Sequence, residues 1–578
     1  MKAGPLVPLG LLLAVQYFGF AILVSTHREK LYFPGVRIVA LHVFLLFDVA
    51  GYILWRALIR PQFSALRDLP KPRTRGGFLT GHVGAVFSNP LGRQVAEWIN
   101  TIPNQGMLWF RGMMGAEYLI AAGADSLRDV LFAQAYDFEK TSAFRRYTKR
   151  FIAAGLVVQE GEIHKANRRA ISPVFQPRAV DALKPMLTRK SEQSIQALLR
   201  RCNQAAGVYS PPQHDGTAVL DICDWATRFA LDVACLVGFG EDFRLAETSE
   251  MKPVLHAYMT IFTGSKAKMS QYAWHNTAPP WLVNAFPHKL DADMDEASRV
   301  IHHLGDEAVR KRLELIQRGE KPPPDFLTEV IQCGKFTPSQ CRDEVLILLA
   351  AAHESTAALI AMTIWRLTQS PELQDQLRNE LKHFGMQAGI ADMSESAYEQ
   401  MTLINAILNE MMRLEPPLPI TLRKAVRNTT VAGHVVKAGT YVVISPYAMG
   451  RSVDIWGSSA LQFNPHRWID PPTEEKPGPS PYGTLNEHGG ASNHYGMLTF
   501  LKGPKGCTGE RFAKAELRRI IAALVANFEW TIEQDHVPEQ VGIVVVKPEN
   551  GIQVRCRPLP RANGLDQGAS LEEKSSLI

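Results

Sequence analysis

The chain has 578 residues, of which 46% are hydrophobic and 21% are charged, and its formal net charge is +6. This composition supplies a large buried core, and the chain has no lysine- and arginine-rich tract of the kind that binds nucleic acid. Its seven cysteines include no Cys-x-x-Cys pair, which argues against a disulfide framework or a zinc site and favours a reducing compartment.

Two apolar segments begin the chain. Leu6–Val24 carries no charge and has the length of a membrane-spanning helix, which needs about 20 residues. The second, Ile38–Trp55, contains His42 and Asp48, so it either spans the bilayer or lies at its interface. A cleaved signal peptide is the alternative for the first segment, but the segment is long for one and has no clear small-residue cleavage site. We expect residues 1–66 to form a membrane anchor with one or two transmembrane helices.

Basic residues and prolines follow the second apolar segment. The excess of arginine and lysine between residues 56 and 75 is typical of the cytoplasmic side of a membrane, and the prolines there stiffen the connection. Residues 67–560 show mostly amphipathic helical patterns, with short strand patterns around Thr440–Ser445 and Gly542–Val546. The expected fold class is therefore mainly α with small β-sheets. The polar residues 561–578 are predicted to form a disordered tail.

A polar break interrupts an apolar helix that is predicted over Asp343–Leu367. His353, Glu354, Ser355 and Thr356 follow one another in the middle of this segment. Four consecutive polar residues cover every face of a helix, so at least one of them must point inward. One interpretation is that His353 and Glu354 face water while the hydroxyls bond back to the helix. The other follows from the flanking alanines, which leave room for a ligand, since an acid and hydroxyls in an apolar wall suit proton delivery.

A lone cysteine near the C-terminus is surrounded by glycines. Cys507 lies among Gly503, Gly506 and Gly509, directly before a segment with helical periodicity. The apolar positions on one face of that segment are Leu517, Ile520, Ile521, Leu524, Val525 and Phe528. A helix N-terminus favours a thiolate, and glycines let a backbone lie close to a bulky partner. We interpret the segment as one that presents sulfur to a large planar group; an inert buried cysteine is the alternative, and it leaves the glycines unexplained.

Four motifs together resemble those of the cytochrome P450 superfamily, the haem-thiolate monooxygenases. The cysteine segment resembles the family signature F-x-x-G-x-R-x-C-x-G, and the polar break resembles its oxygen-binding helix. Glu410-x-x-Arg413 alone would be an ordinary surface salt bridge, but with Arg467 after it the pair resembles the E-x-x-R motif and its charge network. His164-x-x-x-Arg168 stands where the family has W-x-x-x-R. The motifs follow the family order across about residues 73–560, and their details resemble fungal members.

The resemblance implies a cofactor and its contacts. Haem b would be the planar partner and Cys507 the axial ligand of its iron, with Phe500 packed near the sulfur and Gly503 and Gly509 giving clearance for the ring. The residues implied to contact the haem propionates are Arg168, Arg423, Lys505 and His164. Of these, Lys505 replaces an arginine or histidine of the family, and His164 replaces a tryptophan. Structural roles are implied for Glu410, Arg413 and Arg467.

The resemblance also implies a use of O2. Our hypothesis is that Glu354, Ser355 and Thr356 relay protons during oxygen activation, although Ser355 replaces the usual threonine and Ala352 the usual glycine. Two other classes of protein stay open. One is a haem-thiolate isomerase or dehydratase, which needs no O2, and the other is a non-catalytic haem protein. The intact polar cluster argues against both.

The resemblance implies external partners as well, because no flavin or dinucleotide signature is visible. Electrons from NADPH would arrive through a cytochrome P450 reductase, with cytochrome b5 as a second candidate donor. Lys165, Arg169 and Lys502 are expected to form its basic docking surface, or else an ordinary solvated face. The expected location is the endoplasmic reticulum membrane, with the catalytic domain facing the cytoplasm.

The substrate is the least determined feature. Tyr258–Leu290 is rich in aromatic residues, and the resemblance implies a lid there for a lipophilic substrate that enters from the bilayer; plain loop packing is the alternative. Pro419–Leu422 is expected to approach the haem from another side. A terpenoid or polyketide intermediate of secondary metabolism fits this description, and so does a fatty acid. The sequence does not choose between them.

Overall fold

The computed structural model describes Gly19 and residues 34–73, 76–203, 217–386, 393–534 and 539–560. The predicted segment Leu6–Val24 lies outside these residues except at Gly19, and the tail 561–578 lies entirely outside them. The chain forms two compact units, one made of Met1–Gly84 and Trp109–Tyr118 and the other of Ala85–Leu108 and Leu119–Ile578. The chain enters the second unit after Gly84, returns to the first within β1 (Met107–Arg111), and enters the second again within β2 (Glu117–Ala121).

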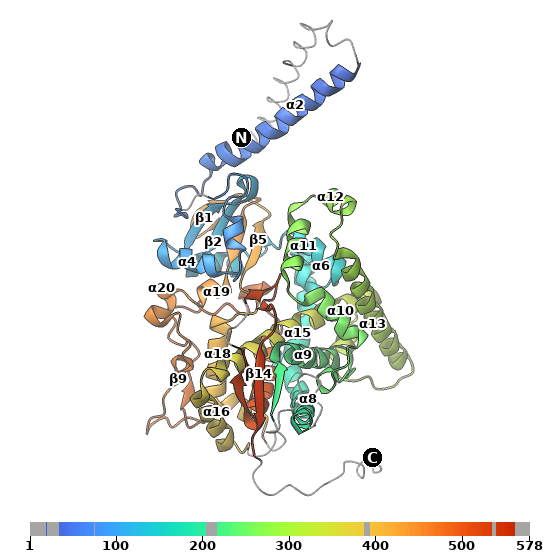
Figure 1. Ribbon diagram of the computed structural model, residues 1–578, viewed down its shortest axis with the longest axis vertical. Coiled ribbons are helices and arrows are strands. Elements are labelled where there is room, and N and C mark those ends of the chain that lie inside the picture. Colours follow the sequence, from blue (N-terminus) through green and yellow to red (C-terminus); the bar gives the residue numbers. More distant parts are fainter. Residues whose placement is uncertain are drawn as a thin grey trace. The chain divides into compact units, whose positions relative to one another are not determined.

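The first unit contains one long helix, α2 (Pro34–Leu54), which coincides with the second apolar segment (Figure 1). A π-helical turn over Trp55–Ile59 and a 3-10 turn over Arg60–Phe63 follow it directly. The 3-10 turn has Pro61 at its start, where the missing N–H of proline costs no hydrogen bond. Large apolar side chains of α2 are exposed, including Leu46 (68%), Phe47 (71%) and Val49 (57%). This unit therefore leaves much of the apolar surface of α2 uncovered.

The second unit is mainly helical, as the amphipathic patterns predict. Its helices are α4 (Arg93–Thr101), α5 (Ala124–Arg128), α6 (Ser142–Phe151), α7 (Gly161–Ile171), α8 (Pro177–Asn203), α9 (Ile222–Phe239), α10 (Pro253–Phe262), α11 (Lys266–Thr277), α12 (Pro280–Ala285), α13 (Asp291–Gln317), α14 (Phe326–Gln332), α15 (Pro338–Thr368), α16 (Pro371–His383), α17 (Ala397–Gln400), α18 (Thr402–Leu414), α19 (Pro446–Met449), α20 (Val453–Trp456) and α21 (Glu510–Asn527).

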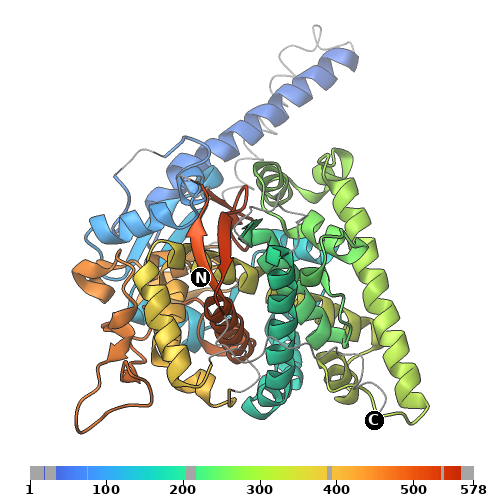
Figure 2. The same ribbon diagram turned by 60° about the horizontal axis from the view of Figure 1, so that its bottom comes forward.

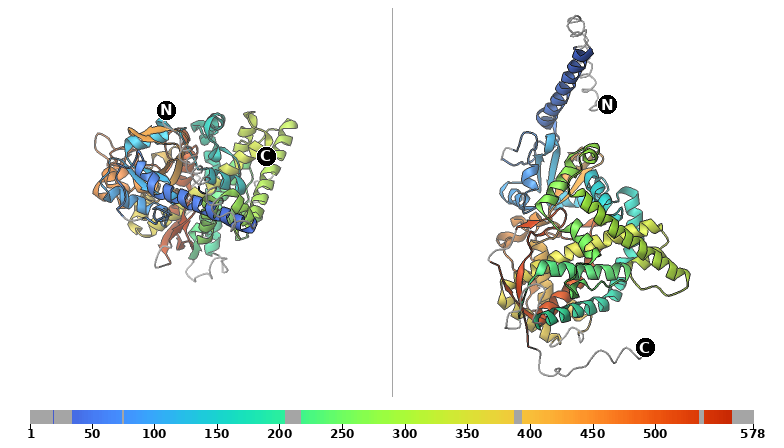
Figure 3. Two further views of the ribbon diagram at one scale, coloured as in Figure 1. Left: turned by 90° about the horizontal axis from the view of Figure 1, so that it is seen from above. Right: turned by 45° about the vertical axis from the view of Figure 1, so that its right-hand side comes forward.

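The central helix of this unit is α15, which was predicted over Asp343–Leu367 and is longer at its N-terminus. Thr337 and Gln340 form a capping box there, and Pro338 occupies the first turn, so the helix begins before the apolar pattern does. Among the described residues, α15 alone has the length and hydropathy to cross a membrane, but 78% of its most apolar window is buried within the protein. It is a core helix, packed against α9 and α21 and against α13 (Figure 3).

Small antiparallel sheets accompany the helices. Their strands in this unit are β3 (Phe138–Glu139), β4 (Ala218–Asp221), β5 (Thr421–Ala425), β6 (Thr429–Val431), β7 (His434–Val436), β8 (Tyr441–Ile444), β9 (Ile469–Asp470), β10 (Thr484–Leu485), β11 (Phe528–Ile532), β12 (Gln540–Val541), β13 (Lys547–Pro548) and β14 (Gln553–Pro558). β5 lies between β3 and β8, with Arg423 opposite Val442. β14 lies between β11 and β4.

The two strand predictions have different outcomes. The pattern around Thr440–Ser445 is confirmed as β8. The prediction around Gly542–Val546 is wrong, because these residues connect β12 to β13 instead of forming a strand. The chain folds back on itself so closely there that a Cβ on Gly542 would lie 1.9 Å from the carbonyl oxygen of Val545. An apolar run alone does not distinguish a strand from the tight turn of a hairpin, and Val544 in this turn is exposed.

The core around α21 follows the predicted apolar face. Leu517, Ile520, Ile521, Leu524 and Val525 are fully buried, and α21 lies beside α8 (Figure 2). Phe528 is buried as expected but is the first residue of β11, because the helix ends at Asn527. The cysteine segment is thus held by a helix that is anchored along its whole length in the core.

Candidate functional site

Cys507 lies in the loop that leads into α21. Its backbone N–H donates a hydrogen bond to the carbonyl of Phe500 (N···O 2.8 Å), which closes the loop. The helix begins at Glu510, with Gly509 at the N-cap position. Of the seven cysteines, all with free thiols, Cys507 is the exposed one. The structure therefore presents this sulfur at a helix N-terminus, where the sequence predicted it.

The glycines around Cys507 are required for different structural reasons. Gly503 has a φ of +74°, and a Cβ there would lie 2.0 Å from the carbonyl oxygen of Leu131, so the protein's own backbone requires it. A Cβ on Gly509 would have one neighbour within 4 Å among the described residues, the sulfur of Cys507 at 3.9 Å. The prediction that both glycines serve a bulky partner needs this correction: space beside the sulfur is kept by Gly509.

The electrostatics of the thiol differ from the expectation of a stabilised thiolate. The side chain of Cys507 is accessible, but the protein on its other sides desolvates the thiol and raises its pKa, although the backbone N–H groups of Gly509 and Glu510 and the charge of Arg168 act in the opposite direction. Desolvation therefore outweighs the helix N-terminus. A thiol that coordinates a metal ion is deprotonated on binding. The N–H donors and the nearby cation fit a sulfur that becomes an anion in this way.

A buried cationic cluster surrounds one carboxylate near the cysteine loop. Lys505 forms an ion pair with Glu160, and Lys140 Nζ lies 3.9 Å from the other oxygen of the same carboxylate. The guanidinium of Arg423 on β5 is buried, and burial lowers its pKa, an effect that the nearby Glu160 carboxylate opposes. Arg168 on α7 donates to the carbonyl of Gly506 (2.7 Å), within the cysteine loop itself.

The cluster carries more positive charge than it can neutralise. Lys140 and Lys505 share Glu160 as their ion-pair partner, and Glu139, which also acts on Lys505, is itself paired with Arg145 (3.3 Å). Burial, followed by repulsion from Arg423, lowers the pKa of Lys140 to about 7. This lowering is the response of a lysine in a region that is short of anions. Haem b carries two propionate carboxylates, so the charge excess and the thiol next to it fit this cofactor.

His164 completes this region from α7. Its ring is buried, and its Nδ1 lies 3.1 Å from the Tyr136 hydroxyl. Burial and the nearby lysines lower the pKa of His164 to about 4, so the imidazole is neutral at pH 7. A neutral imidazole keeps one N–H donor. This agrees with the expected role of a single hydrogen-bond donor toward a carboxylate.

The polar break of α15 is buried, so the interpretation that His353 and Glu354 face water is wrong. Glu354 forms a salt bridge with Lys547 of β13 (2.9 Å), and its Oε1 lies 3.5 Å from His353 Nε2. Burial alone would raise the pKa of Glu354, but the charge of Lys547 and the nearby His353 ring lower it to about 2. The His353 ring in turn packs against the rings of Tyr258 and Phe262 of α10. Glu354 is therefore a paired carboxylate at neutral pH.

The two hydroxyls of the break have different partners. The Ser355 hydroxyl donates to the carbonyl of Ala351 (2.8 Å) within the helix. The Thr356 hydroxyl is buried and donates instead to the carboxyl group of Glu516 on α21. One hydroxyl thus bonds back to α15, as the alternative interpretation proposed, while the other links α15 to the helix that follows Cys507.

Glu516 is the least satisfied carboxyl group of this region. It is buried, and its Oε1 has no hydrogen-bond partner among the described residues. Burial raises the pKa of Glu516 well above its ordinary value, and the hydrogen bond from Thr356 only opposes this. Burial therefore favours the protonated form of this carboxyl group, and the hydroxyl beside it offers a path for proton exchange.

The third predicted motif forms a complete charge network. Glu410 and Arg413 are fully buried and share two hydrogen bonds of 2.7 Å. Arg467 Nε and Trp468 Nε1 also donate to Glu410, at 3.2 and 2.9 Å, and the backbone N–H of Asn464 donates at 2.8 Å. The predicted E-x-x-R pair and Arg467 come together, and the network ties α18 to the segment around Trp468. Its contacts are those of a structural element.

The aromatic segment Tyr258–Leu290 is helical, so the alternative of plain loop packing is wrong. It contains α11, α12 and the end of α10, and it buries Tyr258 while Trp281 and Phe286 stay exposed.

The basic residues predicted to meet a reductase differ from one another in exposure and pairing. Lys165 pairs with Glu162 (2.6 Å), whereas Arg169 and Lys502 are exposed.

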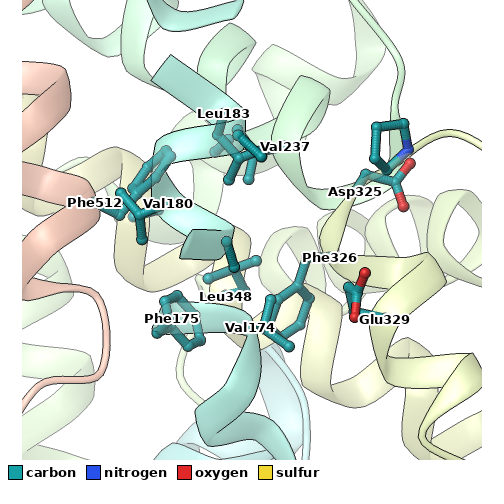
Figure 4. Close-up of a pocket in the computed structure, with 15 residues that line it drawn as sticks. Val174, Phe175, Val180, Leu183, Val237, Asp325, Phe326, Glu329, Leu348 and Phe512 are labelled. Atoms are coloured by element: carbon teal, nitrogen blue, oxygen red, sulfur yellow. The ribbon is translucent and has the colours of Figure 1, made fainter. Parts of the chain in front are cut away.

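A small apolar cavity lies next to α15 (Figure 4). Its volume is about 100 Å³, and its lining includes Leu348 and Ala352 of α15, Val180 of α8 and Phe512 of α21. Figure 4 shows the carboxyl groups of Asp325 and Glu329 at one end, apart from Phe512 and Val180. Pockets for drug-sized molecules have volumes of about 300–1,000 Å³. This cavity is too small to be the substrate site.

Sequence reasoning missed four residues of this site: Glu160, Lys140, Lys547 and Glu516. One of them had a visible signal, because Glu516 is a lone acid between Ala515 and Leu517 on an apolar helix. The others become functional only through partners that are distant in sequence, as with Lys547 and Glu354. No spacing within a single segment indicates such pairs.

Comparison with known proteins agrees with this geometry. The Cytochrome P450 family pattern matches residues 95–556. Cytochrome P450 monooxygenase ptmK of Penicillium ochrochloron is 30% identical over 513 residues, covering 88% of this chain and 97% of that protein. FUM15 of Gibberella moniliformis is 30% identical (89% and 92% covered), and sphH of Aspergillus fumigatus is 29% identical (94% and 98% covered). With its exposed Cys507, its buried cations and its Glu410 network in one unit, this chain belongs to the cytochrome P450 family and is a monooxygenase.

Proposed function

We propose that this chain inserts one oxygen atom from O2 into a lipophilic small molecule, or oxidises it in a related way, while anchored to a membrane. The observation that carries this proposal is the link between α15 and α21. Glu354 and Thr356 of α15, together with Glu516 of α21, the helix that follows Cys507, place polar groups in the apolar interior. Such a set of buried acids and a hydroxyl serves a reaction that consumes protons.

Haem bound through a thiolate supplies the oxygen chemistry, because thiolate donation favours cleavage of the O–O bond. Cys507 would hold the iron. Arg168, Arg423 and Lys505, together with the neutral His164, would hold the propionates, and Phe500 closes the loop beneath the sulfur through its carbonyl. These roles agree with the burial of Arg423 and His164 and with the shortage of anions around them.

Protons reach the site through this chain's own groups. Glu516 holds a proton on its carboxyl group, and the Thr356 hydroxyl touches that group from α15. Glu354 is held as an anion by Lys547, so it accepts a proton only after that ion pair loosens. Ser355 offers a second hydroxyl once it releases the Ala351 carbonyl. We therefore place Glu516 with the predicted Glu354, Ser355 and Thr356 in the proton-transfer set.

We further propose that the chain is anchored in the endoplasmic reticulum membrane and faces the cytoplasm. The exposed apolar side chains of α2, among them Phe47 and Leu46, support a bilayer contact for the first unit. An NADPH-dependent cytochrome P450 reductase, with cytochrome b5 as a second donor, would supply electrons. Arg169 and Lys502 are exposed and available to an acidic partner, while Lys165 must first leave Glu162.

The substrate we propose is a terpenoid or polyketide intermediate of secondary metabolism, with a fatty acid as the alternative. Trp281 and Phe286 support an apolar entry route because they expose large aromatic surfaces on the helical segment Tyr258–Leu290. An exposed aromatic pair on one segment is typical of contact with lipid or apolar ligands.

Comparative metabolite profiling tests the proposal. The host organism is analysed with and without the gene, under conditions where it is transcribed, and the compound that accumulates is then supplied to the full-length protein with reductase. The proposal predicts that the accumulated and missing compounds differ by an oxygen atom or by lost hydrogens. A pair related as isomers, or by one water molecule, would instead support a haem-thiolate isomerase or dehydratase.

A further inference from the structure

We propose that Glu160 is a fixed anion of the propionate-binding cluster, that Lys140 is a further cation of it, and that the two residues together set the reduction potential of the bound haem. The inference rests on the proposed haem site, and it assigns roles to two residues outside the four motifs. The carboxylate of Glu160 lies where three parts of the chain meet.

The contacts of Glu160 explain why it is fixed. The residue precedes α7, which carries His164 and Arg168. Its Oε1 accepts the backbone N–H of Lys140 (2.8 Å), directly after β3, and its Oε2 pairs with Lys505 of the cysteine loop. Its side chain is 3% exposed. A carboxylate held by a backbone donor and an ammonium group cannot turn toward solvent without leaving both unpaired.

Because the charged groups of this cluster are buried, they can change the reduction potential of a nearby haem. The side chain of Lys140 is 16% exposed, and those of Lys505 and Glu160 are nearly inaccessible. Charges in such a region are screened weakly by water and salt, so adding or removing one changes the energy of a neighbouring redox group. The negative charge of Glu160 therefore lowers the reduction potential of the haem, and the positive charge of Lys140 raises it.

The charged groups of this cluster shift one another's pKa values. Burial, followed by the charges of Lys140 and Lys505, lowers the pKa of His164 to about 4, and Glu160 acts in the opposite direction. Burial lowers the pKa of the Arg423 guanidinium, and the same carboxylate opposes that lowering. Glu160 thus couples to both sides of the cluster, the α7 side and the β5 side.

The chain offers a matched control. Glu162 lies two residues further along on α7, and its side chain is 86% exposed, with Lys165 as its partner. Replacing either glutamate by glutamine removes the same charge with nearly the same shape. Since an exposed charge is screened by solvent, only the change at residue 160 is expected to reach the haem.

The experiment measures the haem midpoint potential of the full-length, haem-loaded protein by spectroscopic reductive titration at about pH 5.5, below the pKa of about 7 of Lys140, so that this lysine carries its charge. The variants are Glu160→Gln, Lys140→Met, the double variant and Glu162→Gln. We expect Glu160→Gln to raise the ratio of reduced to oxidised haem about tenfold at a fixed potential, which is about 59 mV for one electron. Lys140→Met shifts the ratio in the opposite direction, and the double variant returns close to the wild type.

A second readout is the rate at which apomyoglobin removes haem. Lys140→Met is expected to speed this loss several-fold, because a cation facing the propionates is gone, whereas Glu162→Gln has no effect. A Glu160→Gln protein with the potential of Glu162→Gln contradicts the inference. If Glu160→Gln does not fold, a Lys140→Met protein whose potential does not fall contradicts it equally. A wild-type protein that binds no haem through a thiolate overturns the proposed function itself, which separates the two failures.

Discussion

Two buried carboxyl groups, Glu410 on α18 and Glu516 on α21, show how this protein uses the same residue type in opposite ways. Glu410 accepts hydrogen bonds from Arg413, Arg467, Trp468 and the backbone of Asn464. These donors outweigh burial and lower the pKa of Glu410, so it is an anion. Glu516 has Thr356 as its donor and one oxygen without a partner among the described residues, and its pKa is raised.

This difference gives the two glutamates different roles, Glu410 in the fold and Glu516 in proton transfer. A carboxylate whose lone pairs are all occupied cannot exchange a proton without breaking several hydrogen bonds, so it serves as a fixed part of the fold. A carboxyl group that is buried and only partly satisfied costs stability, and it keeps its proton available. The predictions below test whether the two glutamates respond differently to the same substitution.

The largest expected effect is that of Glu410→Gln on stability. Glutamine cannot pair with both arginines, so Arg413 is left as an uncompensated buried charge, at a cost of about 3–5 kcal/mol in the free energy of unfolding. The measurement is thermal unfolding together with the yield of haem-loaded protein. As a control, Glu314→Gln breaks an exposed pair with Arg310 (2.7 Å) and should change stability by less than about 0.5 kcal/mol.

The same substitution at Glu516 should leave the fold intact and impair turnover. Glutamine resembles a protonated glutamic acid, so the free energy of unfolding is expected to change by less than about 1 kcal/mol. Without the proton of Glu516, product formed per NADPH oxidised should fall by about 100-fold, the lower range for a lost proton-transfer group. Glu516→Gln with unchanged coupling would remove this residue from the proton-transfer set.

A third glutamate extends the comparison to pH. Burial raises the pKa of Glu344 from 4.5 to about 7, although it accepts hydrogen bonds from the Leu156 N–H and the Gln159 amide. A raised folded pKa means that the folded state binds the proton more tightly than the unfolded state does. The stability from this group is therefore present below its unfolded pKa and is lost as pH rises through the folded value.

We thus expect stability to fall by about 1–2 kcal/mol between pH 5 and pH 7 because of Glu344, and this part of the pH dependence to be absent in Glu344→Gln. Chemical unfolding of both proteins at the two pH values measures it. If the free energy of unfolding falls equally in the two proteins between these pH values, Glu344 is ionised in the folded state and its pKa is not raised.

The smallest effect is expected at Ser355. Its hydroxyl bonds to the Ala351 carbonyl, so Ser355→Ala should change stability by less than about 1 kcal/mol. Product formed per NADPH should fall several-fold, and Ser355→Thr, which keeps the hydroxyl, should restore it. Oxygen uptake and peroxide release measured together detect the change. If Ser355→Ala couples as well as the wild type, this hydroxyl is outside the proton route.

The sequence allowed the local parts of this account to be predicted. Helical periodicity located α15 and the apolar face of α21, and spacing alone paired Glu410 with Arg413. These features depend on residues within a few turns of one another. The cap at Thr337, which starts α15 earlier, and the tight turn at Gly542 depend on backbone geometry that an apolar pattern does not encode.

The electrostatics of the site could not be predicted in this way. Glu354 has its charge fixed by Lys547, Thr356 bonds to Glu516, and Lys505 pairs with Glu160, all across long stretches of sequence. The thiol of Cys507 shows the same limit, because its desolvation by the packed chain exceeds the effect of the helix N-terminus that the sequence made visible. Charge states depend on burial, and burial is a property of the whole fold.

The central claim is that Glu516 carries a proton at neutral pH while Glu410 does not, and infrared difference spectroscopy tests it most directly. The carboxylic acid C=O region of the folded, haem-loaded protein is compared between the wild type and Glu516→Gln, with Glu344→Gln identifying the band of Glu344, a second buried acid whose pKa is raised. The account predicts a protonated-carboxyl band that is lost only in Glu516→Gln and shifts in deuterated water. A spectrum that Glu516→Gln leaves unchanged in this region would contradict it.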